Sequence, residues 1–250
     1  IVRGIKCSGG AHTIRIEEKT LSPCLPFGAS IAVSGACLTV VESDSDTFWA
    51  DIMKETWERT RFPKMRAGER VNLERPLQPG SRIDGHFVQG HIDGVGSVRS
   101  LSRESTATKI TIVADEKIMR YAVEKGSVSL DGVSLTIAEC GQDFFSVGLI
   151  PTTRKMTTLG MLAEGDPVKL EMDILGKYVY RFLEKKRCAL DRNRGRHLGS
   201  LEGSRLLVHP RFLVYGTREG ENVNGYIKRC FQHYRRGYRR HPKWENDHRR

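Results

Sequence analysis

The chain has 250 residues, of which 38% are hydrophobic, and this length suits two modest domains that each bury a core. Its formal net charge of +11 comes from the C-terminal part: residues 185–250 hold 18 Lys and Arg against 6 Asp and Glu, which leaves 23 basic and 24 acidic residues before them. No apolar run is long enough to span a bilayer and no signal segment opens the chain, so we expect no membrane association.

Short β-branched stretches between Gly, Asp and Ser residues predict strands. In chain order they are HTIRI, SIAV, CLTVVE, FWADIM and RVNLE, then KITIVA, SVSL, SLTIAE, FFSVGLI and VKLEMDI. Many short, closely spaced strands are typical of a small barrel, which has no exposed edges. Two segments have helical spacing instead, residues 115–126 and residues 174–186. In the second of these, Leu175, Tyr178, Val179 and Phe182 share one face, which favours a core contact or an oligomer contact.

The stretch SGACLTV at residues 34–40 returns as DGVSLTI at residues 131–137. With a constant offset of 97, residues 30–76 match the second copy at 13 of 47 positions without a gap. One register held for this distance indicates an internal duplication, with one domain per copy. The same offset places Ile1 opposite Val98, so the segment before Val98 has no counterpart. We therefore expect the first copy to lack its opening strand, with about ten residues missing before Ile1.

The six cysteines form no CxxC pair and show no metal-ligand spacing with the eight histidines. We therefore expect free thiols in a reducing compartment and no metal site. The basic tail, residues 188–250, mixes arginines with aromatic residues, as proteins that bind single-stranded nucleic acid do. Its low apolar content and lack of periodicity favour a disordered extension. We expect no nucleic-acid partner and no role for the tail in catalysis.

Several segments in combination resemble the riboflavin synthase family: GACLTV and DGVSLTI, MKETWERT and IPTTRKMTTLG, and DGHFVQGHIDGVG. The resemblance covers residues 1–184. It implies an all-β fold of two similar six-stranded Greek-key barrels, followed by a C-terminal α-helix and here by the basic tail. It also implies a transferase that moves a four-carbon unit between two molecules of 6,7-dimethyl-8-ribityllumazine. The products are riboflavin and 5-amino-6-(ribitylamino)uracil, formed without a cofactor.

The implied domains are residues 1–86 for the first barrel, 87–173 for the second, 174–187 for the helix and 188–250 for the tail. The resemblance implies a homotrimer held by the helix, with each site between the first barrel of one subunit and the second barrel of a neighbour. Lumazine synthase is a further partner that we consider. The expected location is the cytoplasm, or the plastid if the source is a plant.

Two other functions stay open at this point. The family has relatives that bind lumazine or flavin as an optical antenna and do not turn it over. A third hypothesis is a barrel that binds flavin for a reductase. It is weaker, because it needs a nicotinamide-binding domain and no Gly-rich phosphate loop follows a strand here. The combination of reactive side chains described below favours the enzyme.

The resemblance assigns substrate contacts to both copies. In the first barrel they are Ser30, Cys37, Leu38, Thr39, Asp51, Ile52, Met53, Lys54, Glu55 and Thr56. In the second they are Gly90, His91, Ile92, Lys125, Ser134, Leu135, Thr136, Gly148, Leu149, Ile150, Pro151, Thr152 and Thr153. The sequence IPTT departs from the family's usual IPET at Thr152. The expected loss of the opening strand also removes a TGI stretch that lines the first pocket in the family.

The catalytic candidates are Cys37, His91, Ser134, Thr136 and Asp173. The substrate's 7-methyl group is unusually acidic, so a base of near-neutral pKa is useful, and His91 is the natural choice if it lies in a strand that faces the pocket. A histidine five positions earlier would then face the other side of that strand.

Each candidate could also have a purely structural role. Cys37 could add to the ring, hydrogen-bond to it, or simply fill a core. Ser134 and Thr136 alternate to one face and could point at one ligand, although such residues also favour strands. Asp173 could orient a proton transfer or cap the following helix.

Overall fold

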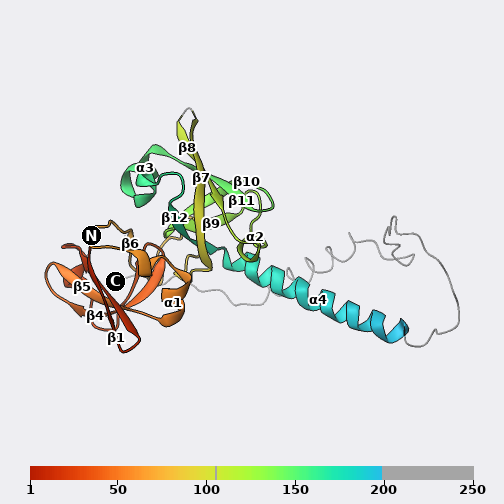
Figure 1. Cartoon of the computed structure of the whole chain (residues 1–250), viewed down its shortest axis with the longest axis horizontal. Helices are drawn as coiled ribbons and strands as arrows, with labels where there is room; N and C mark the ends of the chain where they lie inside the picture. The colour runs from red at the N-terminus through yellow and green to blue at the C-terminus, as the bar shows by residue number, and fades with distance from the viewer. Residues whose placement is uncertain (105, 199–250) are drawn as a thin grey trace, which may run out of the picture. The chain divides into compact units, whose positions relative to one another are not determined.

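The protein is described by a computed structural model that covers residues 1–104 and 106–198, with side chains in the final helix described up to residue 187. Both copies lie within one compact unit, Ile1–His197. Figure 1 shows the first copy in red to orange, the second in yellow to green, and the helix α4 in cyan to blue.

The first copy is a six-stranded antiparallel sheet. Its strands are β1 (Val2–Ser8), β2 (Ala11–Glu17), β3 (Ser30–Val33), β4 (Ala36–Ser43), β5 (Thr47–Ile52) and β6 (Leu73–Glu74), in the spatial order β1-β2-β5-β4-β3-β6. Three short helical segments connect them: η1 (Ser22–Cys24), α1 (Lys54–Arg59) and η2 (Phe62–Lys64). The strands β2 to β6 overlap the segments that the β-branched pattern predicts, with ends that differ by a few residues.

The second copy is a closed six-stranded barrel. Its strands are β7 (Gly94–Glu104), β8 (Ala107–Val113), β9 (Ser127–Leu130), β10 (Val133–Cys140), β11 (Phe144–Leu149) and β12 (Pro167–Met172), in the order β10-β11-β8-β7-β12-β9. The connections contain α2 (Glu116–Met119), α3 (Pro151–Met156) and η3 (Thr158–Met161). The predicted all-β fold of two related six-stranded copies is confirmed, with one copy closed and the other an open sheet.

The difference in closure lies in the opening strand of each copy. In the second barrel, β12 closes the sheet by pairing with the start of β7, where Leu170 lies opposite Gly94 and Pro167 opposite Ser97. The strand β1 corresponds to the later part of β7, because Val2 pairs with Ile16 as Val98 pairs with Ile112, and a bulge follows each pair. The opening strand expected to be lacking is therefore present in part. In the described residues β6 does not pair with β1, and the sheet is open between them.

The pairing also corrects the expected match of Ile1 with Val98, which is wrong by one residue. Ile16 lies opposite Phe48, and Ile112 lies opposite Phe145. The offset between the copies is thus 96 in the first two strands and 97 from β3 onward. The connection between β8 and β9 is one residue longer than that between β2 and β3, and this insertion changes the offset.

Each copy buries its own core, centred on the equivalent residues Phe48 and Phe145, which have no exposed surface. Strand alternation supplies the surrounding side chains, as in β2, where Ile14 and Ile16 are buried and Arg15 between them is not. The core of the first sheet also includes Ile92, from the segment that connects the two copies. The first copy therefore draws a core residue from beyond the predicted boundary at residue 86.

The two copies meet at equivalent turns, Ser34–Gly35 between β3 and β4 and Asp131–Gly132 between β9 and β10. A Cβ atom added to Gly35 would lie 2.5 Å from the backbone nitrogen of Gly132, and one added to Gly132 would lie 2.8 Å from that of Gly35. Both glycines have positive φ angles, 80° and 88°. Only a residue without a side chain fits either position, so backbone touches backbone here.

Different side chains surround this contact on its two sides. Asn72 of the first copy donates through Nδ2 to the carbonyl oxygen of Asp131 at 2.9 Å and accepts from the backbone N–H of Thr158 at 2.9 Å. Its equivalent in the second copy is Lys169, whose Nζ lies 3.9 Å from Asp131 Oδ1 and 4.6 Å from the centre of the Phe62 ring. Lys169 and Asp131 are both buried. Burial lowers the pKa of Lys169 to about 8, against the opposing effect of Asp131.

We expect Gly35→Ala to destabilise the protein by about 1–3 kcal/mol, because the new Cβ meets backbone atoms and the residue must keep a positive φ angle. Urea unfolding of the purified variant measures this loss. Gly4→Ala serves as the control, because a Cβ at Gly4 meets nothing within 4 Å. Equal stability of the two variants would contradict the close contact between the turns.

Two helices differ from their predicted lengths. The predicted helix at residues 115–126 is a single turn, α2, because Ile118 and Met119 enter the second core and the chain must then return to the sheet, where Lys125 donates to Ile137. The C-terminal helix, α4 (Ile174–Leu198), begins where predicted and continues past Arg187 into the predicted tail. No strong helix breaker stands at Arg187, and Ala, Leu and Arg favour helix just beyond it.

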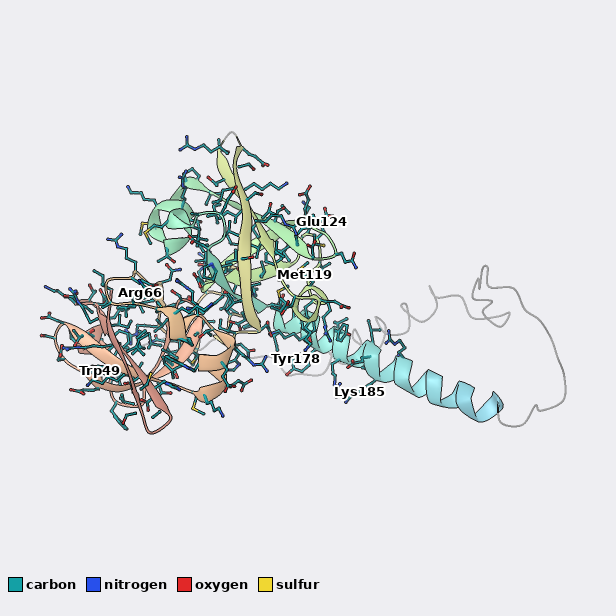
Figure 2. The ribbon with its side chains drawn as sticks, viewed as in Figure 1. Trp49, Arg66, Met119, Glu124, Tyr178 and Lys185 are labelled. Atoms are coloured by element: carbon teal, nitrogen blue, oxygen red, sulfur yellow. The ribbon has the colours of Figure 1, made fainter. Side chains whose placement is uncertain are left out.

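The predicted apolar face of α4 is exposed. Leu175, Tyr178, Val179 and Phe182 are each about 60–70% exposed, and Figure 2 shows Tyr178 projecting from the helix. None of the helices in the described residues is long and apolar enough to cross a membrane. The remainder of the predicted tail lies outside the described residues.

Candidate functional site

The predicted first-barrel residues form a row across neighbouring strands. Ser30 lies opposite Thr39, and Thr39 lies opposite Asp51, so the three occupy adjacent positions on β3, β4 and β5. All three are exposed, and Cys37 shares their face because it is two residues before Thr39. We call this outer face, with Met53 to Thr56 at its end, the first half-site.

The second barrel repeats this arrangement with other side chains. Thr136 lies opposite Ser127, and Ser134 shares its face. Gly148, the equivalent of Asp51, lies opposite Lys109, where the first half-site has Thr13 opposite Asp51. We call this face, with Ile150 to Thr153 at its end, the second half-site. The row that carries an acidic residue in the first half-site thus carries a basic one in the second.

Several predicted contact residues face the cores instead. Leu38, Ile52 and Leu149 are at most 4% exposed, and Leu135 packs against the second core. A ligand on the outer face can meet only their backbone atoms. Gly90 and Ile92 are buried as well, and the remaining second-barrel residues are more accessible. Thr152 and Pro151 lie at the start of α3, and Lys125 is exposed at a turn with a φ angle of 64°.

The segment that connects β6 with β7, residues 75–93, contacts the equivalent positions Cys37 and Ser134. The backbone N–H of Cys37 donates to the carbonyl oxygen of Gly90 at 2.9 Å. A Cβ at Gly90 would lie 2.6 Å from Cys37 Cβ, and one at Gly85 would lie 2.3 Å from Ser134 Oγ. One connecting segment therefore covers the cysteine of the first copy and the serine of the second.

This segment also corrects the position of the histidines. It is irregular from residue 75 to residue 93, because β7 begins only at Gly94, so the strand alternation assumed for His91 and His86 does not apply. The His91 side chain is exposed. His86, which the sequence reasoning set aside, has Nδ1 at 2.8 Å from Ser134 Oγ, and its Nε2 atom is buried without a partner in the described residues.

Charges near His86 affect its protonation. Burial lowers the pKa of His86 below its usual range, and the negative charges of Asp173 and Glu171 partly oppose this effect. The imidazole is therefore neutral at physiological pH and can accept a proton. A histidine bonded to a serine hydroxyl, with two carboxylates nearby, is the arrangement in these half-sites best suited to proton transfer.

The carboxylates also hold the connecting segment in place. Glu171 accepts from the backbone N–H groups of Gln89 and Gly90 at 2.8 and 2.9 Å. Asp93 Oδ2 accepts from the N–H of Met172 at 2.8 Å and pairs with Lys177 Nζ at 2.7 Å. Asp173 Oδ1 accepts from the N–H of Leu175 at 3.0 Å, so the predicted capping role of Asp173 is observed beside its effect on His86.

No group of three or more His, Cys, Asp or Glu side chains in the described residues could hold a metal ion. Among these residues Cys7, Cys24, Cys37 and Cys140 are free thiols. The reactive groups at the half-sites are thus a thiol, hydroxyls, an imidazole and carboxylates. These groups move protons and add to electrophilic carbon.

Comparison with known families gives one matching family, described as "Lumazine binding domain". It matches this chain twice, at residues 2–76 and 89–173. The two matches coincide with the two copies, and each contains one of the two half-sites.

Similar proteins carry a common name. A protein of Mycobacterium bovis named riboflavin synthase is 47% identical over 186 residues, which are 73% of this chain and 92% of the relative. One of Bacillus subtilis with the same name is 36% identical over 184 residues, 74% of this chain and 86% of the relative.

Among solved structures, LumP complexed with 6,7-dimethyl-8-(1'-D-ribityl) lumazine is similar, with a TM-score of 0.62 and 25% identity over 69% of this chain and 93% of that one. LumP complexed with riboflavin has a TM-score of 0.63, over 69% of this chain and 94% of that one. From the double family match and the identity to these relatives, the chain belongs to the riboflavin synthase family.

Proposed function

We propose that this chain catalyses the transfer of a four-carbon unit between two molecules of 6,7-dimethyl-8-ribityllumazine, which gives riboflavin and 5-amino-6-(ribitylamino)uracil. The observation that carries the proposal is the pair of half-sites, which share one geometry but differ at equivalent positions. Cys37 stands where the second copy has Ser134, and Asp51 stands where it has Gly148. Such a reaction needs two identical molecules in unequal roles, one as donor and one as acceptor, and related but unequal half-sites meet that need.

The complete site, in this proposal, forms between the first half-site of one subunit and the second half-site of a neighbour in a homotrimer. Two features support it. The equivalent residues Met53 and Ile150, one at each half-site, are 74% and 59% exposed. The apolar face of α4 is exposed as well. Large apolar side chains that are exposed at both half-sites and along one face of a helix are typical of surfaces that another protein or a ligand covers.

In the proposed chemistry, His86 and Ser134 serve the donor's 7-methyl group. The neutral imidazole accepts the methyl proton, either directly or through the Ser134 hydroxyl, and Asp173 stabilises the imidazolium that results. Cys37 contacts the other lumazine from the first half-site, with its backbone fixed by Gly90. His91 and Thr136 line the second half-site as further ligand contacts.

The direct test mixes the purified full chain with 6,7-dimethyl-8-ribityllumazine alone and follows the products by chromatography. We expect riboflavin and 5-amino-6-(ribitylamino)uracil in equal amounts. Stoichiometric lumazine binding without riboflavin would refute the proposal and favour an antenna role instead. A mass measurement of the assembly in the same buffer tests the homotrimer separately.

Exchange of the two equivalent residues should not be neutral, because a thiol and a hydroxyl differ in size, acidity and hydrogen-bond strength. We expect Cys37→Ser to lower kcat about tenfold while lumazine still binds, and Ser134→Cys to weaken lumazine binding about tenfold. Steady-state kinetics and equilibrium titration measure the two effects. Cys140→Ser, a change at an exposed free thiol at the end of β10, is the control. Full activity in both exchanged variants would contradict unequal roles for the half-sites.

A further inference from the structure

The second barrel has a basic cleft beside α3 that the proposed reaction does not use. Its outer part has a volume of about 490 Å³ and is lined by Arg103, Thr108, Leu149, Arg154 and Lys155, among others. An adjoining inner part of about 250 Å³ shares four of these residues and ends against the apolar side chains of Leu101, Ile110 and Leu159. Arg103 and Arg154 line both parts, so the cleft is basic throughout, and Leu101, Ile110 and Leu159 add apolar surface to its inner part.

The basic charges of the cleft are uncompensated. Arg103, Arg154 and Lys155 are exposed, and none of them forms an ion pair with another described residue. No acidic side chain lines either part of the cleft. Three cationic groups around one concave surface produce a local positive potential that attracts an anion of matching charge.

The cleft lies on the other side of the sheet from the row of the second half-site, and it meets that half-site at Pro151. Leu149 pairs with Thr108, and both side chains line the cleft on the core side of the sheet. The preceding residue, Gly148, belongs to the opposite, outer face, because successive strand residues point to opposite sides. A ligand in the cleft would thus not occupy the row formed by Ser127, Thr136 and Gly148.

The first copy has different side chains at the equivalent positions. Strand pairing makes Cys7 the counterpart of Arg103 and His12 the counterpart of Thr108, and Trp57 corresponds to Arg154. The rings of His12 and Trp57 stack at 4.0 Å, and Cys7 Sγ lies 3.3 Å from His12 Nδ1. Cys7 and Trp57 thus take the places of the two arginines, and Glu58 takes the place of Lys155.

We propose that this cleft binds a small organic phosphate, with the phosphate at Arg103, Arg154 and Lys155 and the organic part toward Leu101, Ile110 and Leu159. The inference goes beyond the proposed reaction, since neither its substrate nor its products carry a phosphate. Guanidinium groups match phosphate oxygens with two parallel hydrogen bonds, and a phosphate monoester carries close to two negative charges at neutral pH. Such a dianion matches three cations better than a singly charged carboxylate does.

Binding of three probes to the full chain tests the proposal: flavin mononucleotide, riboflavin, and inorganic phosphate. Flavin mononucleotide and riboflavin differ only by the phosphate, so the affinity ratio isolates its contribution. In the double variant Arg103→Gln, Arg154→Gln, we expect the affinity for flavin mononucleotide to fall at least about tenfold and that for riboflavin to stay unchanged. Lys117→Gln, a change at an exposed lysine on α2, is the control and should alter neither affinity.

Competition with inorganic phosphate distinguishes a site for free phosphate from a site for an organic phosphate. Competition by millimolar phosphate that the double variant abolishes would support a site for the phosphate group itself. Binding of flavin mononucleotide without such competition would support a site that also needs the organic part. An unchanged affinity for flavin mononucleotide in the double variant, or an equal loss for riboflavin, would overturn the proposal. These measurements do not depend on turnover, so they stand apart from the test of the proposed reaction.

Discussion

Replacing His86 with asparagine should lower kcat about 100-fold or more, because a positioned general base contributes roughly this factor to a proton abstraction. Asparagine can still hydrogen-bond to Ser134 Oγ, which lies 2.8 Å from His86 Nδ1, but it cannot accept a proton. Exchange of the 7-methyl protons with deuterium, followed by NMR, reports this step without full turnover. We expect slow exchange in the variant with lumazine still bound.

His91→Asn is the matched comparison, since it changes another histidine of the same connecting segment whose side chain is exposed. We propose His86 as the base from its contact with Ser134, whereas the sequence alone predicts His91. Normal methyl exchange in His86→Asn together with slow exchange in His91→Asn would return the role to His91.

The pH dependence of the rate separates a chemical role from a structural one. An imidazole accepts a proton only when it is neutral, and burial lowers the pKa of His86 below the usual value of about 6.5. Activity should therefore persist as the pH falls to about 6.5 and decline below it. That decline should disappear in His86→Asn. A loss of structure alone would lower the rate without removing its pH dependence.

Removing the carboxylate of Asp131 should destabilise the protein by about 3–5 kcal/mol, because it leaves the buried charge of Lys169, and Arg61 Nη2 at 3.7 Å, without their shared partner. Asp131→Ser is the suitable change. The equivalent residue Ser34 adopts nearly the same backbone conformation, with a φ angle of 42° against 44°. Its Oγ accepts from the Asn72 N–H as Asp131 Oδ1 accepts from the Lys169 N–H, so serine can keep that bond. Urea unfolding measures the loss.

The double variant Asp131→Ser, Lys169→Asn should recover most of this stability. It places at positions 131 and 169 the same residues, serine and asparagine, that stand at the equivalent positions 34 and 72. A double variant as unstable as Asp131→Ser would show that Lys169 is not the source of the loss.

The stability of the unchanged protein should also depend on pH, with a definite sign. The pKa of Lys169 is lowered to about 8 in the folded state, so its buried charge costs stability below that pH. The cost is relieved as the pH rises from about 8 to about 10.4, the unfolded value.

The fold could be predicted from the sequence because both copies carry the same pattern of strands. Phe48 and Phe145 hold equivalent positions in two cores, and the β-branched pattern around them has the period of strands. The open edge of the first sheet and the one-residue change of offset depend on which residues pair. Pairing between distant strands leaves no local signal, since a shift of one residue changes partners without changing composition.

The site was predictable in part. Ser30, Thr39, Ser134 and Thr136 lie on the outer faces, as strand alternation indicates. His86 was missed because strand alternation was assumed to turn it away from the side that His91 faces, whereas the segment before Gly94 is irregular. The glycines at positions 85 and 90 were the available signal, because glycine within a strand pattern indicates a bend or a close backbone approach.

The contact between Gly35 and Gly132 has the form of a contact on a two-fold axis, where each residue meets its own counterpart. A dimer of two identical chains has interfaces of this kind, and any side chain placed near the axis must appear there twice. In a single fused chain that requirement is lifted. The Asp131 and Lys169 pair is buried on one side only, while Ser34 and Asn72 occupy the other. Fusion thus lets one interface bury charged groups on one side only, with Asp131 paired to both Lys169 and Arg61. It also lets the two half-sites differ in their reactive side chains.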